Sequence, residues 1–253
     1  IIKFIMVKKF FEYVTQAQFE PIKSFHLKDE LNPELWTDYK LDGEVREELL
    51  QIADDYFDDM ELHNVELIDV ILTGSLSNFN WSEYSDYDLH LLYDFSKINE
   101  DEELVKKYLD ANGKIWNTTH DIKIKGYEVE IYSQNITEKH TSSGQFSLKN
   151  NKWIVKPTKE NFKIDEDAIQ QKAEVIMISI NEIENDLEND VDYDDIVLKF
   201  KKVWKKIKEG RKAGLERDGE YSVENLVFKL LRRNGYIGRI IDVKRKSYDK
   251  QFK

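Results

Sequence analysis

Apolar and polar residues follow two kinds of spacing in the first half of the chain. Between Gly43 and about Met60, apolar side chains recur every three or four positions, which predicts an amphipathic helix. Residues 65–74, VELIDVILTG, are apolar and β-branched up to a glycine, and they predict a buried strand. Residues 87–95, YDLHLLYDF, alternate apolar and polar positions and predict a second, half-buried strand. Helical and strand patterns therefore alternate, as in a mixed α and β domain.

The same alternation continues to about residue 135. Residues 100–118 have helical spacing, with Leu104, Tyr108 and Trp116 as the expected apolar anchors. Residues 121–134, DIKIKGYEVEIYSQ, predict one strand or a pair of strands, because the glycine in the middle allows a turn or a bulge.

Beyond residues 149–163, which have the composition of a linker, the pattern becomes helical and stays helical. Three helices are predicted there, over residues 165–189, 194–217 and 222–234. Asp165 and Ser222 are suitable N-caps, and Gly235 is a suitable C-cap.

These patterns predict an α+β fold, with a small mixed β-sheet and flanking helices followed by a C-terminal helical domain. We expect four segments: an N-terminal wrapping segment at 1–41, the mixed domain at 42–148, a linker at 149–163 and a basic helical domain at 164–253.

The composition excludes several kinds of site. The 253 residues include no cysteine, which excludes disulfides, cysteine-bound zinc and thiol catalysis, and which fits a reducing cytoplasm. No apolar run approaches the roughly 18 residues that a membrane-spanning helix needs. We therefore expect a cytoplasmic protein with no membrane partner.

Charge is distributed unevenly along the chain. The net charge is −12, but residues 199–253 contain 18 basic and 7 acidic side chains, whereas residues 1–198 contain 20 and 43. A basic segment after an acidic body suggests an anionic ligand or partner near the C-terminal part. Solvated faces of amphipathic helices explain the lysines equally well.

A pair of aspartates opens the second predicted strand, within the stretch GSLSNFNWSEYSDYDLH at residues 74–90. Asp86 and Asp88 are two positions apart, so both side chains point to the same face of a strand. Neighbouring carboxylates repel each other, and divalent cations that bridge them remove that cost. Mg²⁺ is the natural choice, because it binds carboxylates together with substrate phosphates. We expect two Mg²⁺ ions here, with Mn²⁺ as a substitute.

The residues around the aspartates suit a phosphate group. Gly74 lets the backbone approach a bulky anion closely, and Ser75 can donate hydrogen bonds to phosphate oxygens. Such a site needs a third carboxylate on a neighbouring strand, and the segment GYEVEIYS supplies Glu130, with Glu128 in reserve. A phosphate site beside a two-metal carboxylate site is what phosphoryl or nucleotidyl transfer requires.

This arrangement resembles the signature of the polymerase-β-like nucleotidyltransferase superfamily. The shared features are Gly-Ser, a spacer of about ten residues, Asp-x-Asp between apolar residues and a later strand carboxylate, over about residues 67–132. More weakly, the whole chain resembles nucleotidyltransferases of tailed phages. The resemblance implies a small mixed sheet as the catalytic domain, followed by a helical domain that helps to hold the nucleotide.

The resemblance also implies a role for each residue of the motif. Gly74 and Ser75 would contact the triphosphate. Asp86 and Asp88 would hold both metal ions. Glu130 would bind the catalytic metal and help to deprotonate the acceptor.

Weaker candidates surround this motif. Arg232 and Arg233 suit phosphate binding because a guanidinium contacts phosphate in a bidentate manner, and Lys205 is a further nucleotide-binding candidate. A solvated helix face is the alternative for Lys205, and the two arginines are near a helix end, where cations also favour the macrodipole. His90 either lines the site or packs at the end of the sheet, and the polar residues 140–144 either reach a ligand or form an ordinary loop.

The leading hypothesis is a Mg²⁺-dependent nucleotidyltransferase that moves NMP from an NTP, with ATP as the first choice, to an acceptor hydroxyl and releases pyrophosphate. The acceptor stays open between an RNA 3′ end, a small molecule, a protein hydroxyl and a second nucleotide. Three alternatives remain: a catalytically inactive nucleotide-binding sensor or interaction protein on the same fold, a pyrophosphoryl transferase, and a plain turn before an edge strand with solvated aspartates.

Overall fold

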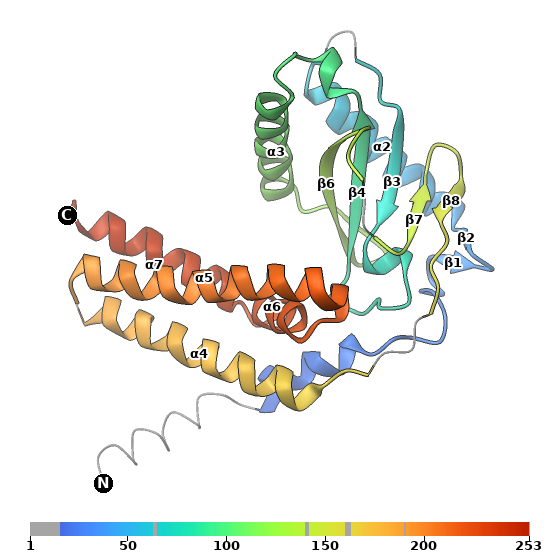
Figure 1. The fold of residues 1–253 in the computed structure, drawn as a ribbon. Helices are drawn as coiled ribbons and strands as arrows, with labels where there is room; N and C mark the ends of the chain where they lie inside the picture. Colours follow the sequence, from blue (N-terminus) through green and yellow to red (C-terminus); the bar gives the residue numbers. More distant parts are fainter. Residues whose placement is uncertain (1–15, 63–64, 140–141, 160–162, 190, 253) are drawn as a thin grey trace. The chain divides into compact units, whose positions relative to one another are not determined.

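The structure is a computed structural model and describes residues 16–62, 65–139, 142–159, 163–189 and 191–252 (Figure 1). The chain forms two compact units. One spans residues 27–160, and the other combines the chain up to His26 with the chain from Asn161 onward. The predicted N-terminal segment 1–41 is therefore divided between the two units at residue 26. Its residues 1–15 lie outside the described part.

The unit at 27–160 is an α+β structure built on a mixed sheet, as the spacing predicted. Its elements are β1 (Trp36–Thr37), β2 (Lys40–Leu41), α2 (Gly43–Asp59), β3 (Asp69–Thr73), η2 (Ser75–Ser77), β4 (Asp86–Tyr93), η3 (Phe95–Lys97), α3 (Glu102–Thr119), β5 (Lys123–Ile124), β6 (Tyr127–Asn135), β7 (Gln145–Ser147) and β8 (Lys152–Val155). Six strands form one sheet in the order β5-β6-β4-β3-β7-β8, and β1 pairs with β2 separately. Only the β4–β6 pair is parallel among these strands. A parallel pair needs a long crossover, which α3 supplies between β4 and β6.

The two faces of this sheet differ in burial, and the alternation along β4 shows it. The β4 residues on the helix-covered face are fully buried: Tyr87, Leu89, Leu91 and Tyr93. They share one hydrophobic core with apolar residues of α2 and α3 (Figure 1). The alternate β4 residues are half-buried: Asp86, Asp88, His90 and Leu92. The predicted strand therefore places its polar residues on the less covered face.

Helix α3 turns a different face toward the core than the sequence predicted. Leu104 and Tyr108, two of the expected anchors, are 57% and 51% exposed, whereas Val105 and Leu109 are buried. Trp116 is partly buried against the core. Both sets of residues have helical spacing, so periodicity alone did not choose between them.

The predicted linker at residues 149–163 is wrong in its first half. Strand β8 lies there and pairs with β7 in an antiparallel hairpin at the end of the sheet. Trp153 of β8 stacks on Trp36 with ring centroids 4.6 Å apart, so this hairpin belongs to the core of the unit. The lysines and asparagines of this segment are typical of a loop, so the sequence did not indicate a strand. Of the residues described in β8, only Trp153 packs against the core.

The second unit is helical. Its elements are η1 (Gln16–Phe25), α4 (Glu166–Glu188), α5 (Tyr193–Asp218), η4 (Gly219–Tyr221), α6 (Val223–Arg233) and α7 (Tyr236–Lys250). The expected N-caps are present, since the side chains of Asp165 and Ser222 accept hydrogen bonds from the backbone of the first turns of α4 and α6. Asn234 is the C-cap of α6, and Gly235 follows it with a positive φ.

Helix α7 was not predicted. It begins directly after Gly235, whose left-handed conformation ends α6 and lets α7 start with only two residues between the helices. Tyr236, Ile240 and Val243 bury one side of α7 against the other helices of the unit. Among the helices that the structure describes, none combines the length and the apolar character needed to cross a membrane.

Two substitutions on α3 test which face supports the core. We expect Leu109→Ala to lower the free energy of unfolding by about 2–5 kcal/mol, because Leu109 is fully buried. Leu104→Ala, the same chemical change on the exposed side, is expected to change it by about 0.5 kcal/mol or less. Urea unfolding of both variants measures this difference, and equal losses would contradict the orientation of α3.

Candidate metal and phosphate site

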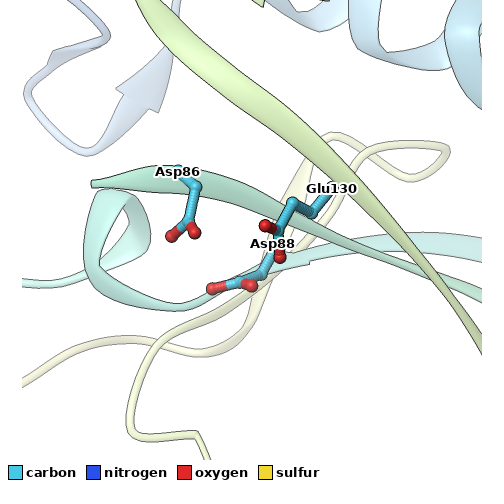
Figure 2. Close-up of side chains that lie close together, drawn as sticks. All are labelled: Asp86, Asp88 and Glu130. Carbon is cyan, nitrogen blue, oxygen red and sulfur yellow. The ribbon is translucent and has the colours of Figure 1, made fainter. Parts of the chain in front are cut away.

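Three carboxylates converge where β4 begins. Asp88 lies opposite Glu130 of the parallel strand β6, and Asp86 lies two residues earlier on the same face of β4. Asp86, Asp88 and Glu130 each offer an oxygen, and these oxygens all lie within 4.8 Å of one another. Figure 2 shows the three side chains directed into the same space. All three residues are half-buried.

The aspartates lie on a central strand. β4 is hydrogen-bonded to β3 on one side and to β6 on the other. The alternative of solvated aspartates on an edge strand is therefore wrong. Its neighbour β6 supplies the third carboxylate, because Asp88 and Glu130 lie opposite each other in the parallel pair.

Gly74 makes this arrangement possible at the end of β3. Its φ of 76° and ψ of −160° lie in a region that is essentially confined to glycine. A Cβ atom at this position would lie 1.9 Å from Oδ2 of Asp88, a distance at which atoms overlap. The chain turn and the aspartate side chain therefore share a space that only a glycine leaves open.

The turn after Gly74 is held by hydroxyl groups. Ser75 Oγ donates to Ser85 Oγ at 2.7 Å, which joins the turn to the residue before Asp86. Ser77 Oγ lies 3.0 Å from the carbonyl oxygens of both Gly74 and Gly144. The predicted phosphate-binding residues Gly74 and Ser75 thus lie next to the carboxylates. The hydrogen bonds of Ser75 and Ser77 stabilise the turn that contains them.

The two glutamates of β6 have different surroundings. Glu130 contributes to the carboxylate cluster, whereas Glu128 is exposed and its Oε1 lies 3.4 Å from Nζ of Lys123. Both share a face of β6, so their separation along the strand decides which one reaches Asp88. The structure places Glu130, and not the reserve candidate, in the cluster.

Tyr132 completes the cluster and was not predicted. Its hydroxyl donates a hydrogen bond to Oε2 of Glu130. Its ring stacks on His90, with centroids 5.2 Å apart and the ring planes 23° apart. Burial, together with the nearby charges of Asp88, Glu130 and Asp86, raises the pKa of Tyr132 above its usual value, so the hydroxyl keeps its proton and remains a donor. Its position two residues after Glu130 was the available signal, since that spacing puts it on the same face.

His90 therefore packs against Tyr132 on the cluster face of the sheet. The polar loop at residues 140–144 is described only from residue 142, and His140 lies outside the described part. Within it, Ser143 Oγ accepts a hydrogen bond from Asn78 Nδ2 at 2.5 Å, so the loop contacts the turn after β3.

The predicted nucleotide-binding cations belong to the helical unit. Arg233 donates to Ser24 Oγ and to the carbonyl oxygen of Pro21, and its guanidinium lies 4.5 Å from the ring centroid of Phe25. It holds η1 against α6. Lys205 is exposed, with its Nζ 3.7 Å from Glu209 Oε1. Arg232 is exposed at the end of α6.

The donor set suits a hard divalent cation. Three carboxylates supply only oxygen ligands, and Mg²⁺ prefers oxygen and keeps positions for water or phosphate. The space that a side chain would need at Gly74 is taken up by the Asp88 carboxylate, so the turn packs directly against one of the three acidic groups. The residues present therefore fit a Mg²⁺ or Mn²⁺ ion.

Comparison with known proteins adds no relative. No protein-family model matches the chain, no curated protein matches its sequence, and no solved structure matches its fold.

Substitution of Gly74 tests the shared space beside Asp88. We expect Gly74→Ala to destabilise the protein by about 1–3 kcal/mol, because of its backbone conformation. It should also weaken Mn²⁺ binding by about tenfold or more, because the new methyl group displaces the carboxylate. Calorimetric titration with Mn²⁺ measures the second effect.

Gly126→Ala is the matched control for this variant. Gly126 also has a positive φ, of 87°, but a Cβ there meets no atom within 4 Å. We expect a loss of stability of about 1–2 kcal/mol and unchanged Mn²⁺ affinity. Equal Mn²⁺ affinities for the two variants would show that the contact with Asp88 is unimportant for the cluster.

Tyr132→Phe tests whether the hydroxyl orients Glu130. The variant keeps the ring stacked on His90 and removes only the donor, so we expect a folded protein whose Mn²⁺ affinity falls by about tenfold. Tyr108→Phe on the exposed side of α3 is the control, and it should bind as the unaltered protein does. Unchanged affinity in Tyr132→Phe would assign the tyrosine to packing alone.

Proposed function

We propose that the protein is a Mg²⁺-dependent nucleotidyltransferase, which transfers NMP from an NTP to an acceptor hydroxyl. The observation that carries this proposal is the meeting of Asp86, Asp88 and Glu130 within 4.8 Å beside the Gly74 turn. Burial of three like charges on two neighbouring strands is costly unless a cation offsets it. ATP is the proposed donor, and its phosphates supply the remaining oxygen ligands that such a cation requires.

Each group of the site has a distinct task in this proposal. Gly74 packs against the Asp88 carboxylate and so keeps the turn next to the proposed cations, and Ser75 donates to a phosphate oxygen in exchange for its bond with Ser85. Asp86 and Asp88 bind the cations from one face of β4. Most of the rate gain would come from positioning and charge neutralisation, as in other phosphoryl transfers.

Glu130 acts on the acceptor. Its carboxylate accepts the proton of the acceptor hydroxyl while the acceptor oxygen forms a bond to the α-phosphorus. The bond between the α-phosphorus and its bridging oxygen breaks, and pyrophosphate leaves with that oxygen. Tyr132 holds one oxygen of Glu130 by its hydrogen bond, which leaves the other oxygen for this role. Bound Mg²⁺ supplies the charge that lowers the pKa of the acceptor hydroxyl and stabilises the leaving pyrophosphate.

The proposal includes the finer assignment of the fold. The mixed sheet with flanking helices at 27–160 is the nucleotidyltransferase-like catalytic domain, and the helical unit assists nucleotide binding, as the resemblance implies. The central position of β4, with the third carboxylate on the adjacent parallel strand, supports this assignment.

The decisive experiment measures label transfer. The protein is incubated with each α-³²P-labelled NTP and Mg²⁺ or Mn²⁺, together with total RNA, with protein extract or with a panel of small hydroxyl compounds. We expect covalent label in one acceptor class and release of pyrophosphate. Transfer should fall by about 100-fold or more in Asp88→Asn, which weakens a ligand of the proposed cations, and in Glu130→Gln, which removes the group that accepts the acceptor's proton.

Glu128→Gln is the matched control. It neutralises a glutamate on the same strand and the same face, but its side chain contacts Lys123 outside the cluster. We expect nearly unchanged transfer. Saturable NTP binding without label transfer would instead indicate a nucleotide-binding sensor, and release of AMP would indicate pyrophosphoryl transfer.

A further inference from the structure

The helical unit contains a cavity of about 480 Å³ between α4, α5 and α6. This volume lies within the range of about 300–1,000 Å³ that small-molecule sites occupy. Most of the wall is formed by apolar side chains: Val175, Ile176, Ile207, Val227, Phe228 and Leu231. All of these residues belong to one compact unit, and none belongs to the carboxylate cluster. The cavity is therefore a separate feature of the molecule.

Charged side chains on the cavity wall are not balanced in sign. Glu224 lies 2.6 Å from Lys172 Nζ and 3.0 Å from Arg217 Nη2, so its charge is already paired twice. Lys206 and Arg211 also line the cavity. Neither makes an ion pair with any carboxylate in the part of the chain that the structure describes. The wall thus carries an excess of positive charge.

Arg211 is the most informative of these residues because it is half-buried. Its guanidinium lies 4.0 Å from the ring centroid of Phe228, and its Nε donates to Asn225 Oδ1 at 3.0 Å. Burial and the neighbouring charge of Arg232 lower the pKa of Arg211 below its usual value. A partly desolvated guanidinium with only a neutral acceptor is costly, and a bound anion removes that cost.

We propose that this cavity binds a small apolar molecule that carries one carboxylate or phosphate group. The apolar body occupies the space between α4, α5 and α6, and the anionic group contacts Arg211 and Lys206. Apolar lining with a few convergent polar groups is the usual character of such sites.

The binding of amphiphiles to the full chain tests whether the cavity prefers a ligand with an anionic head group. Decanoate, decyl phosphate and decanol share one apolar chain and differ in head group, and isothermal titration calorimetry gives a Kd for each. We expect decanoate or decyl phosphate to bind at least about tenfold more tightly than decanol, because a charged hydrogen bond adds roughly that factor. Whichever anion binds more tightly identifies the head group.

One arginine variant and one lysine variant distinguish a direct contact between Arg211 and the anion from a general effect of net charge. Arg211→Met keeps most of the side-chain volume and should weaken anion binding by about tenfold, with little effect on decanol. Lys212→Met removes the same charge from an exposed neighbour whose Nζ lies 3.9 Å from Glu216, and it should bind as the unaltered protein does. Equal Kd values for the two variants would overturn the proposal.

Gly210 offers a test of the cavity that does not damage the fold. It lines the cavity within α5, and a Cβ there meets only Glu224 Cγ, at 3.8 Å. Gly210→Met therefore places a side chain in the cavity and should abolish anion binding, while Gly210→Ala should retain it. Both should have a Tm equal to or above that of the unaltered protein, since each replaces a glycine within a helix.

Three further results would overturn the assignment. They are no measurable binding of either anion, undiminished binding in Gly210→Met, and displacement of bound decanoate by ATP. The last would make the cavity part of the proposed transfer site rather than a separate one. None of the three depends on whether the carboxylate cluster is catalytic.

Discussion

Electrostatic repulsion among three carboxylates is the constraint on which the rest of the structure depends. Unit negative charges about 5 Å apart repel by roughly 3 kcal/mol at an effective dielectric constant of ~20, and Asp86, Asp88 and Glu130 bring three together within 4.8 Å. The surrounding chain forces this closeness. The parallel pairing of β4 with β6 sets Asp88 against Glu130, the glycine turn leaves room for Asp88, and the Tyr132 hydroxyl holds Glu130. The proposed cation would offset this repulsion at the point where the three carboxylates meet.

Much of the carboxylate site could be predicted from the sequence, because the patterns that indicate it lie within short segments of the chain. The two aspartates share a face by strand geometry alone, and the glycine before the turn was evident from its position after an apolar run. Tyr132 was not predicted, although it is two residues after Glu130 and therefore lies on the same face of the strand. An aromatic residue on a strand is usually part of the core, so its type did not indicate a role beside the carboxylates. Its value comes from a hydrogen bond to a neighbouring side chain, which composition does not reveal.

Other features could not be predicted because they depend on contacts distant in sequence. Leu104 and Leu109 both fit a helical period, and only the position of α3 on the sheet decides which is buried. β8 reads as a linker, but Trp153 joins the aromatic core through Trp36, more than a hundred positions away. Arg233 looked like a phosphate ligand, yet its guanidinium fastens η1 to α6.

Thermal unfolding with and without Mg²⁺ tests the central claim most directly. Without divalent cations, Asp86→Asn should melt about 2–4 °C above the unaltered protein, because one of three repelling charges is gone. Mg²⁺ should raise the Tm of the unaltered protein and leave that of Asp86→Asn nearly unchanged. Glu83→Gln, the same kind of neutralisation at an exposed residue three positions earlier, should behave as the unaltered protein does. An equal response to Mg²⁺ in all three proteins, or a lower Tm for Asp86→Asn in its absence, would contradict the account.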